Sequence, residues 1–210
     1  MKIGVISDTH NRHRKLKNIE KYNIDCLVCC GDTHFNTESY KKFIKWFGKL
    51  NIKYKILISG NHDIEIWKNF KSCKKDFDKY NIIYLQDESI EIEGVKFYGT
   101  PWSPVYGQYY FTMEDCFLSE KWKQIPKDTE ILITHCPSYK ELDLSIENEN
   151  CGSYTLSLRK KELKELKYHL FGHIHECRGI LKMENYTNIN ASCFNYNNDK
   201  EVYSPIIINI

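Results

Sequence analysis

The sequence predicts an α/β fold in which two packed β-sheets carry helices on their outer sides. Between residues 3 and 80, short apolar runs typical of buried strands alternate with stretches of helical periodicity. This order favours parallel strands covered by helices. The rest of the chain is again rich in short strands, which favours a second sheet. The chain has 210 residues, a length typical of one domain, so residues 1–210 are expected to form a single domain.

In the first part of the chain, strands alternate with helices. The predicted strands are Ile3–Ser7, Asp25–Cys30 and Tyr54–Ser59, and the predicted helices are Arg14–Tyr22, Thr37–Phe47 and Ile64–Tyr80. One face of the third helix carries Trp67, Phe70, Cys73 and Phe77 and is expected to be buried. Cys26 and Cys29 form a C-x-x-C pair, but residues i and i+3 of a strand face opposite sides. We therefore interpret both as buried thiols rather than metal ligands.

The second part of the chain is predicted to consist mostly of strands. These are Ile82–Leu85, Ser89–Ile92, Val95–Tyr98, Glu130–Thr134, Tyr168–Phe171, Arg178–Met183, Tyr186–Asn190 and Pro205–Ile208. Gly94 is expected to turn the second and third of them into a hairpin. Helices are predicted at Leu156–Lys167 and at Thr112–Gln124, with Thr112 and Asp115 in capping-box positions.

The composition narrows the class of protein. A net charge of +2, with lysine and acidic residues interspersed, indicates neither a strongly basic nucleic-acid surface nor a dedicated nucleic-acid module. No stretch approaches the roughly 18 consecutive apolar residues of a membrane span, and no signal peptide is visible. The nine cysteines, an odd number, fit a reduced compartment, so a cytoplasmic protein without membrane attachment is expected. The oligomeric state stays open.

Polar side chains of the metal-ligand type follow five of the predicted strands. They are Asp8, His10, Asp32, Asn61, His62, Asp63, His135, His173 and His175. Each alone has a simpler interpretation, because an aspartate can form a turn and a histidine can belong to the core. In α/β sheets, however, sites form beyond the carboxyl ends of the strands. These residues are therefore expected to converge although they are far apart in the sequence.

The residue types favour a metal centre. Mixed carboxylate, amide and imidazole ligands suit Mn²⁺, Fe²⁺ or Zn²⁺, and the absence of cysteine from the set argues against structural zinc. The expected ligands are Asp8, His10, Asp32, Asn61, His135, His173 and His175. Asp32, central in the set, is the candidate bridge between two ions. Two ions roughly 3.5–4 Å apart would polarise a phosphoryl group and generate a bound hydroxide as nucleophile.

Together these motifs resemble the calcineurin-like metallophosphoesterases. The motifs are Asp8-Thr9-His10, Gly31-Asp32, Gly60-Asn61-His62-Asp63, His135 and Gly172-His173-Ile174-His175, in the family's order. The resemblance is closer still to the metallophosphoesterase-domain-containing branch. The segments that carry it are Ile6–His10, Tyr84–Asp87, Tyr98–Pro104, Phe171–Glu176 and Ile189–Ser192. They span nearly the whole chain.

The resemblance implies a four-layer α/β/β/α sandwich of two mixed sheets flanked by helices. It implies one metal ion between Asp8, His10, Asp32 and His175, and a second between Asp32, Asn61, His135 and His173. It also implies catalytic roles for Asp32, Asn61 and His62, with Asn61 and His62 against the phosphate and His62 protonating the leaving oxygen. Mn²⁺ is the expected ion, with Fe²⁺, Zn²⁺ and Mg²⁺ as alternatives. The branch resembles phosphodiesterases of cyclic nucleotides that also bind purine monophosphates.

Three flanking segments depart from the family's pattern. Thr33-His34, Cys136-Pro137 and Glu176–Gly179 replace an apolar residue, a Gly-Pro pair and a smaller glycine-containing segment. These changes concern substrate identity more than metal binding. Among the histidines outside the motifs, His34 is a candidate support for the ligands, His13 is expected to be exposed, and His169 is expected to pack in a strand.

Two further residues are candidates for substrate contact. Trp102 lies in the Pro/Gly-punctuated segment Thr100–Gly107. It either stacks on a nucleobase or covers the edge of the core. Arg178, close to His175, either meets a phosphate through two hydrogen bonds or is an ordinary surface residue.

We therefore expect a phosphodiesterase that acts on small nucleotides with a metal-bound hydroxide. Three alternatives stay open. The first is the same chemistry on another phosphate ester, as in a phosphatase or nuclease. The second is a nucleotide-binding regulatory protein of the same fold with weak or no turnover, which an assay with excess Mn²⁺ would identify. The third is a partner-binding protein with an inert site, which predicts no stabilisation by nucleotides.

Overall fold

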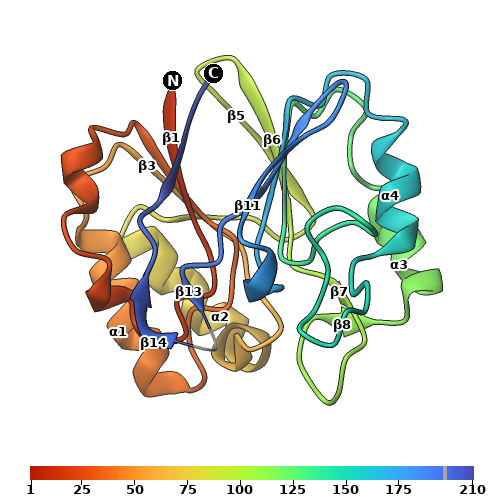
Figure 1. Cartoon of the computed structure of the whole chain (residues 1–210). Helices are drawn as coiled ribbons and strands as arrows, with labels where there is room; N and C mark the ends of the chain where they lie inside the picture. The colour runs from red at the N-terminus through yellow and green to blue at the C-terminus, as the bar shows by residue number, and fades with distance from the viewer. Residues whose placement is uncertain (196–197) are drawn as a thin grey trace.

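The computed structural model, which describes residues 1–195 and 198–210, arranges the chain in four layers (Figure 1). Two mixed sheets pack face to face, and each carries helices on its outer side. The predicted α/β/β/α architecture is confirmed. None of the helices in the described part of the chain is long and apolar enough to cross a membrane.

The first sheet has the strand order β15-β1-β2-β3-β4. Its strands are β1 (Lys2–Ile6), β2 (Cys26–Cys29), β3 (Tyr54–Leu57), β4 (Ile83–Tyr84) and β15 (Ile206–Asn209). The strands β1 to β4 are parallel, and β15 is antiparallel to β1. Helices α1 (Thr37–Lys49) and α2 (Ile64–Lys79) pack on the outer side of this sheet.

The second sheet has the strand order β11-β12-β10-β9-β6-β5. Its strands are β5 (Glu88–Ile92), β6 (Val95–Thr100), β9 (Ile131–Thr134), β10 (Tyr168–Phe171), β11 (Gly179–Lys182) and β12 (Thr187–Asn190). The four central strands are parallel and the two edge strands are antiparallel to them. Helices α3 (Asp115–Trp122) and α4 (Tyr154–Lys160) cover its outer side, and short strands pair as β7 (Ser103–Pro104) with β8 (Thr112–Met113) and β13 (Phe194–Asn195) with β14 (Asn198–Val202).

The alternation of side chains along each strand divides the core into two parts. Ile3 and Val5 of β1 face the second sheet and pack in the cluster between the sheets. Ile6 faces the other way and belongs to the cluster beneath the helices. Cys26 and Cys29 of β2 divide in the same manner, and both are buried free thiols. Their interpretation as core residues is confirmed.

The parallel strands of both sheets end at the same side of the molecule. In Figure 1, β1 runs from the labelled N-terminus towards the lower edge, and β15 returns to the C-terminus beside it. The loops after β1, β2, β3, β9 and β10 therefore gather away from the termini. This lower edge is where the sequence places its candidate ligands.

One predicted helix of the first half is wrong. Arg14–Tyr22 forms two 3₁₀ turns, η1 (His13–Lys15) and η2 (Ile19–Tyr22), instead of an α-helix. The cause is Asn18, which adopts a left-handed φ of 61° that an α-helix does not tolerate. Ile19 is nevertheless buried. The apolar pattern therefore identified a buried residue correctly, but the α-helical backbone predicted for the segment is wrong.

Two predicted helices of the second half are shorter than expected. The helix predicted at Thr112–Gln124 is α3, which begins only at Asp115, because Thr112 pairs in β8. The predicted capping box is absent, and Asp115 instead accepts hydrogen bonds from Ser153 and Thr155. The helix predicted at Leu156–Lys167 is α4, which ends at Lys160.

The buried face of α2 is only partly as predicted. Phe77 is buried, but Trp67 and Phe70 are 47% and 41% exposed. Asn69 leaves helical geometry, with φ of −127° and ψ of 36°, which changes the direction of the residues around it. Ile66 takes the buried position that Trp67 was expected to occupy.

The burial predicted for two histidines outside the motifs is right for one and wrong for the other. His169 of β10 is fully buried, as expected. The expectation that His13 is exposed is wrong, because only 1% of it is accessible. Its ring packs against Phe43 and Trp46 of α1, with ring centroids 5.5 Å and 5.1 Å away.

Candidate metal centre

The polar side chains from five strand ends meet between the two sheets. Loops after β1, β2 and β3 contribute Asp8, His10, Asp32 and Asn61, and loops after β9 and β10 contribute His135, His173 and His175. Two groups among the described residues could hold a metal ion. Asp8, His10 and His175 form the first, and Asp32, His135 and His173 form the second, with ligand atoms within 4.8 Å of one another in each.

Asp32 lies between the two groups. Its Oδ2 atom is 3.3 Å from Nε2 of His135 in the second group and 3.9 Å from Nε2 of His10 in the first. Asn61 adds an amide oxygen to the second group, since its Oδ1 is 2.9 Å from Nε2 of His135. Asp32 is therefore placed to serve both groups at once.

Two of the histidines are oriented from behind by the backbone. Nδ1 of His135 is 2.8 Å from the carbonyl oxygen of Cys30, and Nδ1 of His175 is 2.8 Å from that of Phe194. A carbonyl oxygen only accepts hydrogen bonds, so each Nδ1 donates. Each Nε2 then faces the centre, which is the arrangement typical of metal-binding histidines.

The electrostatics of the centre favour a cation. Burial disfavours the charged imidazole of His135, but the Asp32 carboxylate outweighs this and raises its pKa to about 9. Burial would likewise raise the pKa of Asp32, yet the surrounding histidines hold it well below its usual value. A positive charge is thus stabilised where the two groups meet. A divalent ion would interact favourably with the same carboxylates as the proton on His135 does.

The Asp8 carboxylate provides a direct test of whether these residues fit metal ions. Its Oδ2 accepts hydrogen bonds from the Ser192 hydroxyl at 2.8 Å and from the His173 N–H at 3.0 Å. Its Oδ1 is buried and has no hydrogen-bond donor among the described residues. The nearest imidazole nitrogen, Nε2 of His175, is 3.4 Å away. A buried carboxylate oxygen in this state fits a metal ligand, so the first group fits a divalent ion. The donor types of the second group, a carboxylate and two imidazoles, suit a divalent ion as well.

Asp63 fixes the loop that carries Asp32. Its buried carboxylate accepts hydrogen bonds from the backbone N–H groups of Asp32, Thr33 and Gly60 at 3.0, 2.8 and 2.8 Å. Nδ1 of His34 lies 2.9 Å from the same carboxylate. Burial alone would raise the pKa of Asp63, but His34 and the N–H donors outweigh it and hold the pKa below its usual value. The sequence motif contained Asp63 but gave no hint of this role.

The ligand residues occupy an uncommon backbone conformation. Asp8, His10, Asp32 and His173 have φ angles of 54°, 41°, 53° and 69°. This left-handed region disfavours residues other than glycine, so the surrounding contacts must hold it in place. Glycines make the space: a Cβ atom on Gly60 would lie 2.3 Å from Oδ1 of Asp32, and one on Gly172 would lie 2.0 Å from Oδ2 of Asp8.

A cavity of about 550 Å³ opens over the centre. Asp32, Asn61, His173 and His175 lie at its base, and its walls come from Pro104–Tyr109 and Ser145–Gly152. His62 also lines it, with its side chain 23% exposed and Nε2 3.8 Å from Oδ2 of Asp32. The His62 ring touches Tyr109, at a centroid distance of 4.6 Å.

Two parts of this surround were not identified from the sequence. Phe35, 47% exposed, stacks on His10 at 5.1 Å and meets His62 edge-on at 5.4 Å. The segment Ser145–Gly152 forms a wall of the cavity. Neither carries a motif. The single signal was indirect, namely the departure from the family's pattern at Thr33-His34, next to Phe35.

The structure does not bring Trp102 or Arg178 into this cavity. Trp102 is 9% exposed, its indole N–H donates to Asp87 at 3.0 Å, and Lys121 lies over its ring at 4.4 Å. Arg178 donates to the backbone carbonyls of Ser192 and Ser204 at 2.7 and 2.6 Å. Both side chains are therefore engaged in packing or in linking loops.

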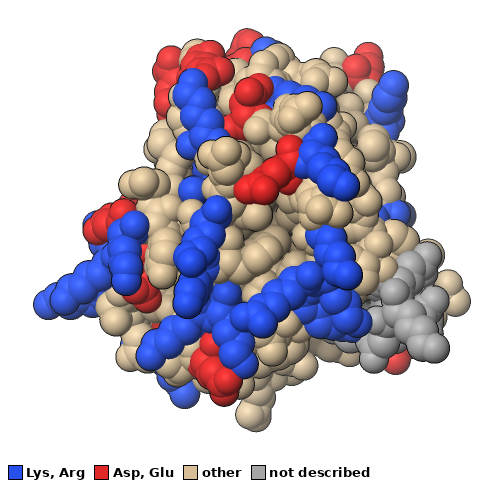
Figure 2. Space-filling model, turned by 90° about the vertical axis from the view of Figure 1, so that its left-hand side faces the viewer, with Lys and Arg blue, Asp and Glu red and all other residues tan. Residues whose placement is uncertain are grey.

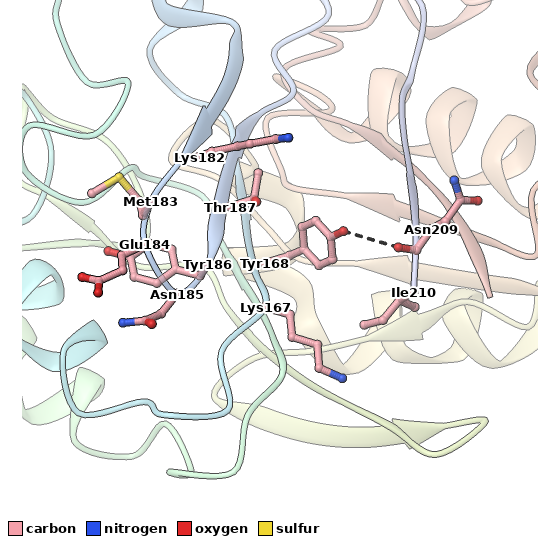
Figure 3. Close-up of a pocket in the computed structure, with 10 residues that line it drawn as sticks. All are labelled: Lys167, Tyr168, Lys182, Met183, Glu184, Asn185, Tyr186, Thr187, Asn209 and Ile210. Carbon is pink, nitrogen blue, oxygen red and sulfur yellow. Dashed lines mark hydrogen bonds between the residues drawn. The ribbon is translucent and has the colours of Figure 1, made fainter.

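A second groove, of about 450 Å³, lies at the opposite ends of the strands (Figure 3). Lys167, Tyr168 and the β11–β12 turn line it, and the Tyr168 hydroxyl donates to the carbonyl of Asn209 at 3.3 Å. Its lining residues include no histidine or cysteine, and Glu184 is the one carboxylate among the lining residues described. This groove therefore offers no cluster of metal-ligand side chains among its described lining residues.

Comparison with known proteins agrees with this geometry. A family model described as calcineurin-like phosphoesterase matches residues 1–177, a stretch that contains every predicted ligand. The chain belongs to this family. As a calcineurin-like phosphoesterase it is a member of a group of metal-dependent enzymes that act on phosphate esters.

The chain covers about 70% or more of the length of two individual relatives. The chain is 34% identical to UPF0046 protein K07C11.7 of Caenorhabditis elegans, over 100% of this chain and 75% of that protein. It is also 34% identical to metallophosphoesterase domain-containing protein 1 of Homo sapiens, over 98% of this chain and 69% of that protein. A solved structure described as a novel archaeal phosphodiesterase superposes with a TM-score of 0.51 at 21% identity, covering 99% of this chain and 100% of that one. That likeness shows a shared fold.

Proposed function

We propose that this calcineurin-like phosphoesterase is a phosphodiesterase that hydrolyses cyclic or other small nucleotides, with two Mn²⁺ ions as its working metals. The observation that carries the proposal is the position of Asp32, shared by two ligand groups at the base of a cavity. The cavity volume of about 550 Å³ suits a small ester better than a macromolecular surface. The archaeal structure of the same fold, described as a phosphodiesterase, supports this reaction class.

The metal ions would be held by seven side chains. Asp8, His10, Asp32 and His175 would surround one ion, and Asp32, Asn61, His135 and His173 the other. When bound, such a pair of ions polarises a phosphoryl group and makes water a stronger nucleophile. The chain's own contribution is to fix these ligands, through Asp63 on one side and Ser192 on the other.

His62 is the proposed proton donor to the leaving oxygen. Its ring lines the cavity, and its backbone N–H donates to Oδ1 of Asp32 at 2.8 Å, which ties its position to the centre. Phe35 and Tyr109 both contact the ring, with centroids 5.4 Å and 4.6 Å away, and these contacts restrict its orientation. Asn61, which also lines the cavity, is proposed to contact the phosphate.

A hydrolysis panel in excess Mn²⁺ tests the proposal. The substrates are bis-p-nitrophenyl phosphate, p-nitrophenyl phosphate, 2′,3′- and 3′,5′-cyclic nucleotides, a phosphopeptide and single-stranded DNA. We expect turnover of the diesters, with cyclic nucleotides preferred over the monoester and the macromolecules. Preference for the monoester or the phosphopeptide would identify a phosphatase, and preference for DNA a nuclease. Nucleotide binding without turnover of any ester would identify a regulatory protein.

A further inference from the structure

The outer part of the cavity carries a charge opposite to that of its base. Two divalent ions at the base would exceed the charge of Asp8 and Asp32. Above them, three exposed carboxylates belong to the lining, namely Glu147, Glu149 and Glu176. No lysine or arginine lines the cavity in the part of the chain that the structure describes. A phosphate group would therefore be attracted at the base, while any further anion would meet negative charge at the rim.

The exposed basic side chains lie elsewhere. Figure 2 shows lysine and arginine gathered on the side of the molecule that carries η1, η2 and α1. Arg14, Lys17, Lys41 and Lys45 are among the exposed residues of these segments. The acidic rim is thus a local property of the cavity and does not follow from the net charge of +2.

The same cavity has an apolar wall. Tyr106 is 67% exposed, and Val105 beside it is 47% exposed. Ile146, from the other wall-forming segment, is 62% exposed. Large apolar side chains exposed together in a concave site are typical of a surface that contacts a ligand. A tyrosine ring offers a stacking surface for a flat group.

We infer that this cavity selects phosphodiesters that carry a single negative charge and one flat apolar group, and that Glu147, Glu149 and Tyr106 enforce the selection. The inference rests on the proposed phosphodiesterase function and specifies its substrate class. The metal centre neutralises the one charge of a diester. A second phosphate on the same small molecule would be repelled by the rim carboxylates that line the same cavity, because charges at physiological salt interact over roughly 8 Å.

A matched pair of substrates tests the role of charge. Thymidine 5′-(p-nitrophenyl phosphate) and its 3′-phosphorylated derivative share the same scissile bond and differ only in the added phosphate. We expect kcat/KM to be at least about tenfold higher for the first compound, and the ratio to approach 1 in the double variant Glu147→Lys/Glu149→Lys. In 0.5 M NaCl, where the screening length is about 4 Å, the ratio for the unmodified protein should also fall.

The control carries the same change of charge at the other end of the strands. Glu91 of β5 and Glu184 of the β11–β12 turn are exposed and do not line the cavity. The double variant Glu91→Lys/Glu184→Lys should keep the ratio of the unmodified protein. The inference is overturned when both double variants shift the ratio equally, or when Glu147→Lys/Glu149→Lys leaves it unchanged.

A second pair of substrates tests the apolar wall. Methyl p-nitrophenyl phosphate lacks the nucleoside of thymidine 5′-(p-nitrophenyl phosphate). Loss of a stacking ring in Tyr106→Ala should lower kcat/KM for the thymidine ester about 5- to 150-fold and leave the methyl ester unaffected. Phe117 of α3, 63% exposed and outside the cavity, provides the control, since Phe117→Ala should change neither value. Equal losses on both esters in Tyr106→Ala would contradict the inference.

Equilibrium binding separates this inference from the proposed function. Absence of turnover with every diester would reject the phosphodiesterase. The charge selection is then decided by calorimetry with the Mn²⁺-loaded protein, using adenosine 5′-monophosphate and adenosine 3′,5′-bisphosphate. Weaker binding of the bisphosphate, restored in Glu147→Lys/Glu149→Lys, supports the selection. Equal or tighter binding of the bisphosphate by the unmodified protein rejects it.

Discussion

At the scale of single residues, Asp32 joins the two halves of the centre. Its carboxylate lies within 4 Å of histidines from both groups, which makes it the proposed bridge between two ions. In Asp32→Ala we expect the Mn²⁺ content, measured by mass spectrometry, to fall from close to two ions per chain by at least one. Asp128→Ala, which removes an exposed carboxylate far from the centre, is the control. An unchanged two-ion content in Asp32→Ala would remove Asp32 from the bridging role.

His62, the proposed proton donor, belongs to neither ligand group. Its removal in His62→Ala should keep the metal content and lower kcat by about 10²–10⁴-fold, as for a general acid. The loss should be larger for an alkyl leaving group than for p-nitrophenolate, which needs little protonation. Equal losses with both leaving groups would instead assign His62 to phosphate binding.

His13 is expected to lower the stability of the protein in acid. Burial, with smaller contributions from Arg14 and Lys42, lowers its pKa from 6.5 to about 4. The unfolded chain then binds more protons than the native state between these values, so the free energy of unfolding decreases as the pH falls from 6.5 towards 4. The expected loss is on the order of 2–3 kcal/mol.

Replacing the titrating ring tests this prediction. In His13→Leu, urea unfolding between pH 7 and pH 4 should show a shallower decrease of stability than in the unmodified protein. Trp46→Phe alters the packing around the same site without removing a titrating group, and should retain the original pH dependence. The same slope in His13→Leu and the unmodified protein would show that other groups determine the acid sensitivity.

At the scale of elements, the cavity walls are loops held from behind by buried polar groups. The segment between β9 and α4 contains Glu141, which pairs with the fully buried Lys160 of α4. Lys160 also donates to Ser138 and Asn188, each at 2.8 Å. Breaking such a buried pair by removing one partner typically costs about 3–5 kcal/mol. The wall that includes Glu147 and Glu149 therefore extends from a rigid base.

The segment after β6 is held in a different way, by Trp102. Because its ring packs against Phe111 and its N–H binds Asp87, we expect Trp102→Ala to destabilise the protein by about 3–5 kcal/mol. Turnover of nucleotides and of bis-p-nitrophenyl phosphate should decline in similar proportion. Trp102→Phe, which keeps most of the packing, should recover most of the melting temperature. A selective loss of nucleotide turnover in Trp102→Ala would restore the nucleobase-stacking interpretation.

At the scale of the whole molecule, the centre links the two sheets. Candidate ligands after β1, β2 and β3 lie near candidate ligands after β9 and β10, so ions bound there would stabilise the packing of one sheet against the other. Binding to the native state alone should raise the free energy of unfolding by about 2.7 kcal/mol when the free ion exceeds its Kd a hundredfold. Mn²⁺ should raise the melting temperature and a chelator should reverse the rise. No shift in either direction would contradict metal binding at this centre.

Most of the candidate site could be predicted from the residues that follow the strands. A strand reads as a short apolar run, and a parallel strand places the residue after it at a known edge of the sheet. Asp8, Asp32, Asn61 and His135 were found in this way, and the structure brings them together. The pairing of β15 with β1 could not be predicted from the sequence, because the residues of an apolar strand do not indicate which other strand it pairs with.

The incorrect predictions concern two features without a local sequence pattern: interruptions of the helical backbone, and the burial of individual aromatic side chains. Asn18 and Asn69 each depart from helical geometry, although the sequence around them keeps the apolar spacing of a helix. Propensity differences of a few tenths of a kcal/mol per residue do not identify such positions. Trp102 and Tyr106 lie four residues apart in similar aromatic context, yet the first is buried and the second is exposed in the cavity. Only the tertiary packing distinguishes them.

The position of β1 also has a consequence for biosynthesis. This strand lies between β2, which is made soon after it, and β15, which is made only after the other strands of the two sheets. At about 5–20 residues per second, β1 waits roughly 10–40 seconds for its second neighbour. During that interval it offers an unpaired edge to other nascent chains. His175 is also made late, so a metal ion that meets Asp8, His10 and Asp32 during translation would lack the fourth ligand proposed for it. Metal loading is therefore expected to follow the synthesis of His175, and holdase chaperones that cover the β1 edge would increase the yield of folded protein.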